Sequence, residues 1–221
     1  MGERSPDTLV VAEANRDAAQ LLTDWRTWPG GALALIGPAG SGKTHLALAW
    51  ALEAGAREVS PGDAPEAAAE RFQEAGGRLL LEDADQGADD VTLWRVLDLA
   101  RTRGGAVLLT GKSPPSAWPA ADPPLRTRLT ALPVARLGEP DLGLMEVVLR
   151  RLCREQFIQL SDDAAKYLVV RLPRTFAAAR AAAFALDQIV VRGARPVSVV
   201  VAKRALEHMK EAWGPWETDG T

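Results

Sequence analysis

Residues 37–44, which read GPAGSGKT, decide the fold of this 221-residue chain. They match the pattern G-x-x-x-x-G-K-[ST] at every required position. An apolar run over residues 32–36 precedes them and a helical pattern from residue 43 follows them, which is the strand, loop and helix setting that the pattern needs. That setting disfavours the alternative, a glycine-rich turn that fits the pattern by chance. The stretch therefore predicts an α/β fold built around a phosphate-binding loop.

On both sides of this loop, short apolar runs alternate with longer helical patterns, as is typical of βαβ units in a parallel sheet. The expected strands cover residues 32–36, 57–59, 79–81, 106–110 and 132–137. The expected helices cover residues 15–25, 43–54, 65–75, 90–103 and 121–129. We therefore expect a five-stranded, doubly wound parallel sheet that binds its ligand at the carboxyl ends of the strands.

Strand patterns stop after residue 138, and four helical patterns follow. Asp141 is placed to cap a helix that runs to about residue 154, and Ser161 to cap the next. A third helix is expected over residues 175–191, and a fourth from Pro196 to about residue 210. We expect an α/β nucleotide-binding domain over residues 1–138, a small helical lid domain over residues 139–211, and a disordered tail over residues 212–221.

The bulk composition disfavours several classes of protein. A net charge of −3 argues against a domain that grips phosphate backbones, so we expect no sequence-specific DNA binding. The single cysteine, Cys153, cannot form an internal disulfide, and one Cys with two His does not make a zinc-ligand pattern. No leader segment and no run of about eighteen apolar residues is visible, which predicts a cytoplasmic protein without a membrane span.

The loop supplies the chemistry that a nucleotide needs. Its glycines let the backbone N–H groups wrap the phosphates, and the following helix adds a favourable field. Lys43 is expected to reach the β- and γ-phosphates, and the Thr44 hydroxyl to bind Mg²⁺. The predicted ligand is ADP or ATP with Mg²⁺. The residues of the predicted loop are Gly37, Pro38, Ala39, Gly40, Ser41, Gly42, Lys43 and Thr44.

A second motif follows the apolar run at residues 79–81. Glu82 stands where Asp commonly contacts Mg²⁺ through water, and its extra methylene displaces the carboxylate. Asp83 is then the better candidate for polarising the attacking water, and Asp85 is expected to cap the next turn. The alternative is a solvated acidic cluster, which pairing with the loop disfavours.

Three arginines stand out. Arg126 and Arg128 share a short predicted helix just before a strand, and taken alone they would be interpreted as solvated surface residues. Arg180 lies among Ala, Phe and Leu in the third predicted helix of the lid, so its charge either snorkels to solvent or faces a phosphate.

From about residue 8 to residue 209 the chain resembles the DnaA/Hda branch of the AAA+ ATPases. The resemblance rests on the loop continuing into His45 and Leu46, on the double proline of residues 109–115, and on residues 8–11 before the first helix. It implies a nucleotide site that also includes Val10, Val11 and His45. It further implies that Arg128 is an arginine finger reaching a neighbour's nucleotide in trans, and that Arg180 is the lid's sensor arginine in cis.

The resemblance is nearest to the Hda-like regulators, because the chain stops after the lid without a helix-turn-helix domain. It implies a nucleotide-bound factor that promotes ATP hydrolysis by DnaA together with the sliding clamp of DNA polymerase III. No clamp-binding peptide is evident, since Gln20-Leu21-Leu22 has core spacing. Lys112 replaces the family's usual Asp at the first sensor, and with Glu82 it predicts weak intrinsic ATPase activity.

Two other functions remain open. One is an autonomous ATP-driven assembly factor, similar to DnaA or to a helicase loader, that hydrolyses its own ATP in a homo-oligomer. The other is a P-loop kinase, which is less favoured because no acceptor site is apparent. Steady-state turnover and phosphoryl transfer to small acceptors separate these functions.

Overall fold

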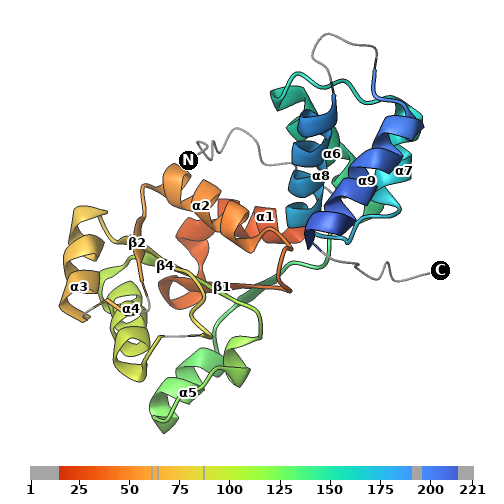
Figure 1. Ribbon diagram of the computed structural model, residues 1–221. Helices are drawn as coiled ribbons and strands as arrows, with labels where there is room; N and C mark the ends of the chain where they lie inside the picture. Colours follow the sequence, from red (N-terminus) through yellow and green to blue (C-terminus); the bar gives the residue numbers. More distant parts are fainter. Residues whose placement is uncertain (1–14, 61, 64, 87, 191–195, 214–221) are drawn as a thin grey trace. The chain divides into compact units, whose positions relative to one another are not determined.

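The computed structural model describes residues 15–60, 62–63, 65–86, 88–190 and 196–213. The chain divides into two compact units, Met1–Gly138 and Glu139–Thr221 (Figure 1). Val10, Val11 and the end of the expected tail, residues 214–221, lie outside the described residues. No helix in the described part is long and apolar enough to cross a bilayer.

The first unit contains the predicted five-stranded parallel sheet. Its strands are β1 (Ala32–Ile36), β2 (Arg57–Val59), β3 (Arg78–Leu81), β4 (Ala106–Gly111) and β5 (Val134–Arg136), in the order β2-β3-β4-β1-β5. All four neighbouring pairs are parallel. Because β1 lies between β4 and β5, the loop after β1 lies at the carboxyl end of the sheet, between the ends of β4 and β5. That is the usual place for a ligand in a doubly wound fold.

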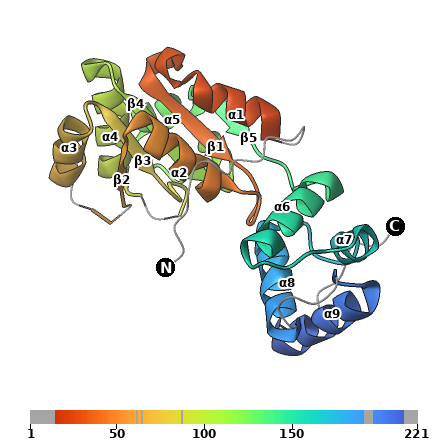
Figure 2. The same ribbon diagram turned by 90° about the horizontal axis from the view of Figure 1, so that it is seen from above.

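Helices cover both faces of the sheet (Figure 2). On one face, α1 (Arg16–Thr23) and α2 (Lys43–Ala54) share a core with Leu33 and Leu35. On the other, α3 (Pro65–Glu74), α4 (Asp90–Arg103) and α5 (Pro123–Thr130) share a core with Ala34 and Ile36. Successive side chains of a strand point to opposite faces, and here both are buried. This explains why β1 is apolar throughout rather than alternating.

Strand β5 is shorter than the predicted run of residues 132–137. The Leu132 N–H still donates to Leu129 O of the preceding helix, at 3.2 Å, and Pro133 has no N–H to give. Regular pairing with β1 covers Val134–Arg136, and it is flanked by bonds from the Ala34 N–H to Pro133 O at 3.0 Å and from the Leu137 N–H to Ile36 O at 2.8 Å.

The described part of the second unit has four helices: α6 (Leu142–Glu155), α7 (Asp162–Val169), α8 (Phe176–Ile189) and α9 (Val199–Trp213). Asp141, Ser161 and Thr175 cap the first three by accepting a backbone N–H from the first turn. A single core of leucine, alanine and methionine joins the helices. The tail prediction is wrong at its start, because α9 continues through residues 212 and 213.

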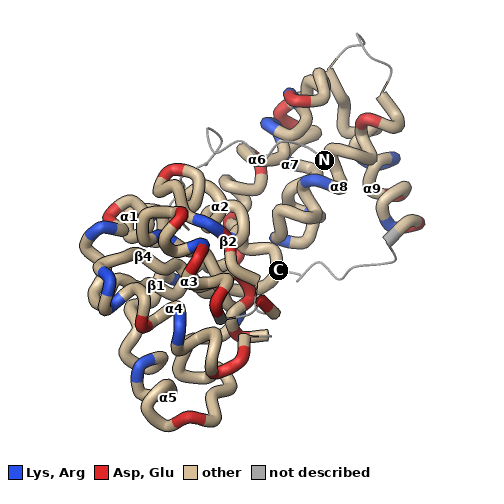
Figure 3. Tube along the Cα trace, turned by 90° about the vertical axis from the view of Figure 1, so that its left-hand side faces the viewer, with Lys and Arg blue, Asp and Glu red and all other residues tan. Residues whose placement is uncertain are grey.

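Charged residues of both signs are interspersed along the described trace (Figure 3). Within the first unit, acidic and basic positions follow one another on the same elements, as with Asp90 and Arg95 on α4. This mixed distribution accords with the small net charge of −3.

Candidate functional site

The backbone of residues 37–44 is shaped by its glycines. A Cβ on Gly37 would lie 2.4 Å from Leu137 O and 2.9 Å from Ser41 Oγ, which no side chain tolerates. Gly40 and Gly42 have φ values of +78° and +95°, a region that favours glycine. The Gly37 N–H donates to Gly111 O at 3.2 Å, which ties the start of the loop to the end of β4.

Lys43 begins α2 and turns back over the loop. Its side chain is buried, with 8% of the residue exposed, and Nζ donates to Gly37 O at 2.7 Å and to Pro38 O at 2.9 Å. Partial burial lowers the pKa of Lys43 below its ordinary value, whereas the carboxylates of Asp83 and Asp85 act to raise it. The ammonium is therefore held at the loop with acidic groups beside it.

Two hydroxyls flank this lysine. Ser41 is buried, with 5% exposed, and its Oγ has no hydrogen-bond partner among the described residues. Buried hydroxyls are nearly always bonded, so this one is available to a ligand oxygen. Thr44 and His45 are exposed on the first turn of α2, where the positive end of the helix dipole favours an anion. The loop thus offers hydroxyl, ammonium and N–H donors together, which suits a polyphosphate.

The acidic motif follows β3. Glu82 is half-buried and Asp83 is exposed, and both act electrostatically on Lys43. Asp83 adopts a left-handed conformation, φ +49°, which Asp tolerates better than most residues. Its N–H donates to Thr110 Oγ1 at 2.9 Å, and the next N–H, from Ala84, donates to Thr110 O at 2.8 Å. Thr110 of β4 therefore fixes the turn that presents Asp83, a role that sequence reasoning missed.

The expectation that Asp85 caps the turn that follows it is wrong. Its Oδ2 instead accepts the N–H groups of Lys112 at 2.7 Å and Ser113 at 3.2 Å, in the loop after β4. Only the proximity of two neighbouring strand ends makes this bond possible, and spacing along the chain gives no signal of it. Asp85 therefore positions Lys112, the residue at the expected first sensor.

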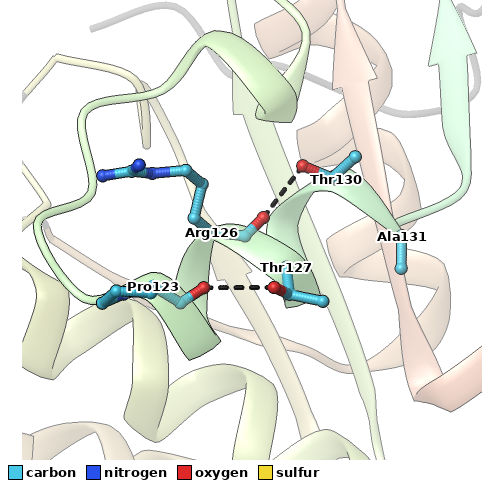
Figure 4. Close-up of a pocket in the computed structure, with 5 residues that line it drawn as sticks. All are labelled: Pro123, Arg126, Thr127, Thr130 and Ala131. Carbon is cyan, nitrogen blue, oxygen red and sulfur yellow. Dashed lines mark hydrogen bonds between the residues drawn. The ribbon is translucent and has the colours of Figure 1, made fainter.

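The two arginines of α5 have different surroundings. Arg128 is half-buried, with its Cζ 3.9 Å from the ring centroid of Trp94 and NH1 3.7 Å from Asp98 Oδ1. Arg126 is exposed and donates to Ala120 O at 2.8 Å. It lines a groove of about 570 Å³ with Pro123, Thr127, Thr130 and Ala131 (Figure 4).

Arg180 lies in the second unit. It is exposed on α8, whose buried face consists mostly of alanine. The first unit therefore brings together the loop, the acidic residues and Lys112, whereas Arg180 belongs to the other compact unit.

The structure of this chain is similar to several solved structures. Domain III of the replication initiation protein DnaA from Thermotoga maritima matches with a TM-score of 0.72 at 16% identity, over 93% of this chain and 96% of that chain. The RuvB Holliday junction branch migration motor of Thermotoga maritima matches with a TM-score of 0.70 at 17% identity, over 94% of this chain and 72% of that chain.

An AMPPCP-bound DnaA from Aquifex aeolicus matches with a TM-score of 0.66 at 17% identity, over 94% of this chain and 70% of that chain. No protein-family model and no curated protein matches the sequence. At such low identities the likeness establishes the architecture, and the chain has the fold of the AAA+ P-loop ATPases.

Proposed function

We propose that this chain binds an adenine nucleotide, ATP or ADP, in the loop of residues 37–44. The observation that carries the proposal is the loop itself: Gly37 has no room for a Cβ, Gly40 and Gly42 have positive φ values, and the buried ammonium of Lys43 closes the loop. The AMPPCP-bound state of the similar Aquifex aeolicus DnaA supports an adenine nucleotide. Val10 and Val11 remain the proposed contacts for the adenine, and His45 remains a proposed nucleotide contact next to the loop.

Each loop residue then has a role. Lys43 would exchange its bonds to Gly37 O and Pro38 O for phosphate oxygens, and Ser41 Oγ would gain a partner. Thr44 and, through water, Glu82 would hold Mg²⁺, which when bound neutralises phosphate charge. Asp83, which is exposed at the turn held by Thr110, would accept a proton from water.

The finer proposal is regulatory: an Hda-like factor that, with the sliding clamp, promotes ATP hydrolysis by DnaA. It is supported by the resemblance in sequence and by Arg128 on an element that is separate from the loop. In this role Arg128 acts in trans on the partner's nucleotide. The alternative, a homo-oligomer that hydrolyses its own ATP, is favoured by the placement of Asp83. Rapid steady-state turnover by the isolated chain would support it.

Lys43→Ala tests nucleotide binding. Removing the charge that faces the phosphates should weaken ADP and ATP binding by about a hundredfold, since hydrogen bonds to charged groups are the strong ones. Fluorescent-nucleotide titration measures this, and Lys166→Ala on the exposed face of α7 is the control. Equal affinity in parent and Lys43→Ala would mean that the loop is not the site.

Arg128→Ala tests the regulatory role. An arginine supplied in trans accelerates phosphoryl transfer by about 10³ to 10⁵. The substitution should therefore abolish stimulation of DnaA while leaving ADP affinity intact. Single-turnover decay of DnaA-bound ATP, with clamp loaded on DNA, is the measurement. Equal stimulation by parent and variant would dismiss the finger, and a loss of ADP affinity would place Arg128 at the chain's own nucleotide.

A further inference from the structure

One face of α4 contacts α5 and the residues just before it. Asp90, Trp94 and Asp98 are spaced four residues apart, so they lie in a row along one side of the helix. All three contact the segment of residues 121–128. We call these three residues the α4 row.

The first two members fix the start of α5. Asp90 Oδ2 accepts the N–H groups of Ala121 and Asp122, both at 2.9 Å. The indole Nε1 of Trp94 donates to Asp122 Oδ2. Asp122 is the N-cap of α5, yet its side chain makes no capping bond. An N-cap aspartate normally stabilises its own helix by a local bond, so here the tertiary contact replaces the local one.

The last two members hold the Arg128 guanidinium. It lies over the Trp94 ring at 3.9 Å, and NH1 is 3.7 Å from Asp98 Oδ1, too long for a hydrogen bond. NH1 is buried and has no hydrogen-bond partner among the described residues. The exposed 30% of the side chain therefore belongs to its other atoms. Stacking fixes the plane of the group. Because NH1 is buried beside Asp98, the donors that a partner's phosphate could reach are those of the exposed atoms.

We infer that Trp94 and Asp98 are positioning residues that hold Arg128 ready for the nucleotide phosphates of a partner ATPase. The inference rests on the proposed trans role of Arg128. A free arginine loses much side-chain freedom when it docks, and the Trp94 stack removes that loss in advance. We therefore expect the α4 row to help Arg128 bind the partner's phosphates, and not to hold Arg128 away from them.

The test compares stimulation of DnaA-bound ATP hydrolysis by the full chain and its variants. Trp94→Leu, which removes the ring, should slow the stimulated rate about tenfold, since small misplacements of a reacting group are costly. Trp94→Phe keeps a weaker ring and should fall between Trp94→Leu and the parent. Asp98→Asn, a polar surface change that spares the core, should slow the rate about threefold. ADP affinity and the thermal midpoint of Asp98→Asn should equal those of the parent.

Two controls match these changes. Trp25→Leu removes another half-buried tryptophan that carries a stacked guanidinium, Arg26 at 4.2 Å, and Arg126→Ala removes the exposed arginine of the same helix. Both should keep full stimulation. Unchanged stimulation in Trp94→Leu and Asp98→Asn would overturn the inference. Increased stimulation would also overturn it, because it would show that Trp94 and Asp98 hold Arg128 back from the partner.

A second readout is independent of the partner. Ring-current shifts of the Arg128 side-chain NMR signals should be present in the parent and absent in Trp94→Leu. If the parent does not stimulate DnaA, the proposed function fails and the delivery role with it, while these shifts still decide whether Trp94 orients the guanidinium. Unshifted signals in the parent would overturn the positioning whatever the activity.

Discussion

At the scale of single residues, Gly37 shows how narrowly the loop is built. Its Cα faces the carbonyl of Leu137 and the hydroxyl of Ser41, and its N–H is bonded to Gly111 O. The loop, the end of β4 and the segment after β5 therefore meet at one residue that has no side chain. The motif pattern requires glycine here, and the structure gives the physical reason.

Gly37→Ala should consequently destabilise the protein and prevent nucleotide binding. A Cβ 2.4 Å from Leu137 O forces β1 away from the segment after β5, at a cost of about 1–3 kcal/mol. Urea unfolding with and without ADP measures both effects. Gly138→Ala is the matched control, because nothing lies within 4 Å of a Cβ there. Parental stability and ADP affinity in Gly37→Ala would show that the loop can shift without loss of function.

At the scale of elements, local signals predicted most of the fold. The runs at residues 32–36 and 57–59 are β1 and β2 with the expected bounds, and the helices at residues 43–54 and 90–103 are α2 and α4. These succeed because burial on both faces, glycine C-caps and an aspartate N-cap are local features. The end of α9 was placed three residues early, because nothing local stops the helix at residue 210.

The contacts between elements were not predictable in the same way. Asp85 accepts hydrogen bonds from residues that are 27 and 28 positions away in the sequence. The hydrogen bond from Trp94 to Asp122 spans 28 positions. Such bonds depend on which strand ends and helix faces become neighbours, which composition and periodicity do not encode. The motif predicted that Lys43 and Thr44 lie in the loop. The contact of Thr110 with Asp83, and those of the α4 row with Arg128, could be found only from the structure.

At the scale of the whole molecule, the chain has two compact units, each with a core of its own. Cys153, the only cysteine in the chain, is fully buried in the core of the second. Burial raises the pKa of its thiol to about 12, which the charge of Arg150 only partly offsets. A thiol reagent at pH 8 therefore finds almost no thiolate and must wait for the second unit to open. Labelling of Cys153 thus reports that opening.

This thiol can test whether Arg180 links the units. If Arg180 contacts nucleotide bound in the loop, opening the second unit must break that contact, so ADP should slow Cys153 labelling. The slowing is bounded by the binding linkage, about a hundredfold at a hundred times the Kd. Arg180→Ala should lose most of it without unfolding, because alanine suits a helix interior.

Two variants complete this comparison. Lys43→Ala should show no ADP effect because binding itself is lost. Arg174→Ala, another exposed arginine of the second unit, should keep the full effect. Equal protection by ADP in the parent and in Arg180→Ala would show that another residue couples the units. Rapid labelling of the nucleotide-free parent at pH 8 would instead show that the second unit opens readily, because a closed core gives the reagent no access to Cys153.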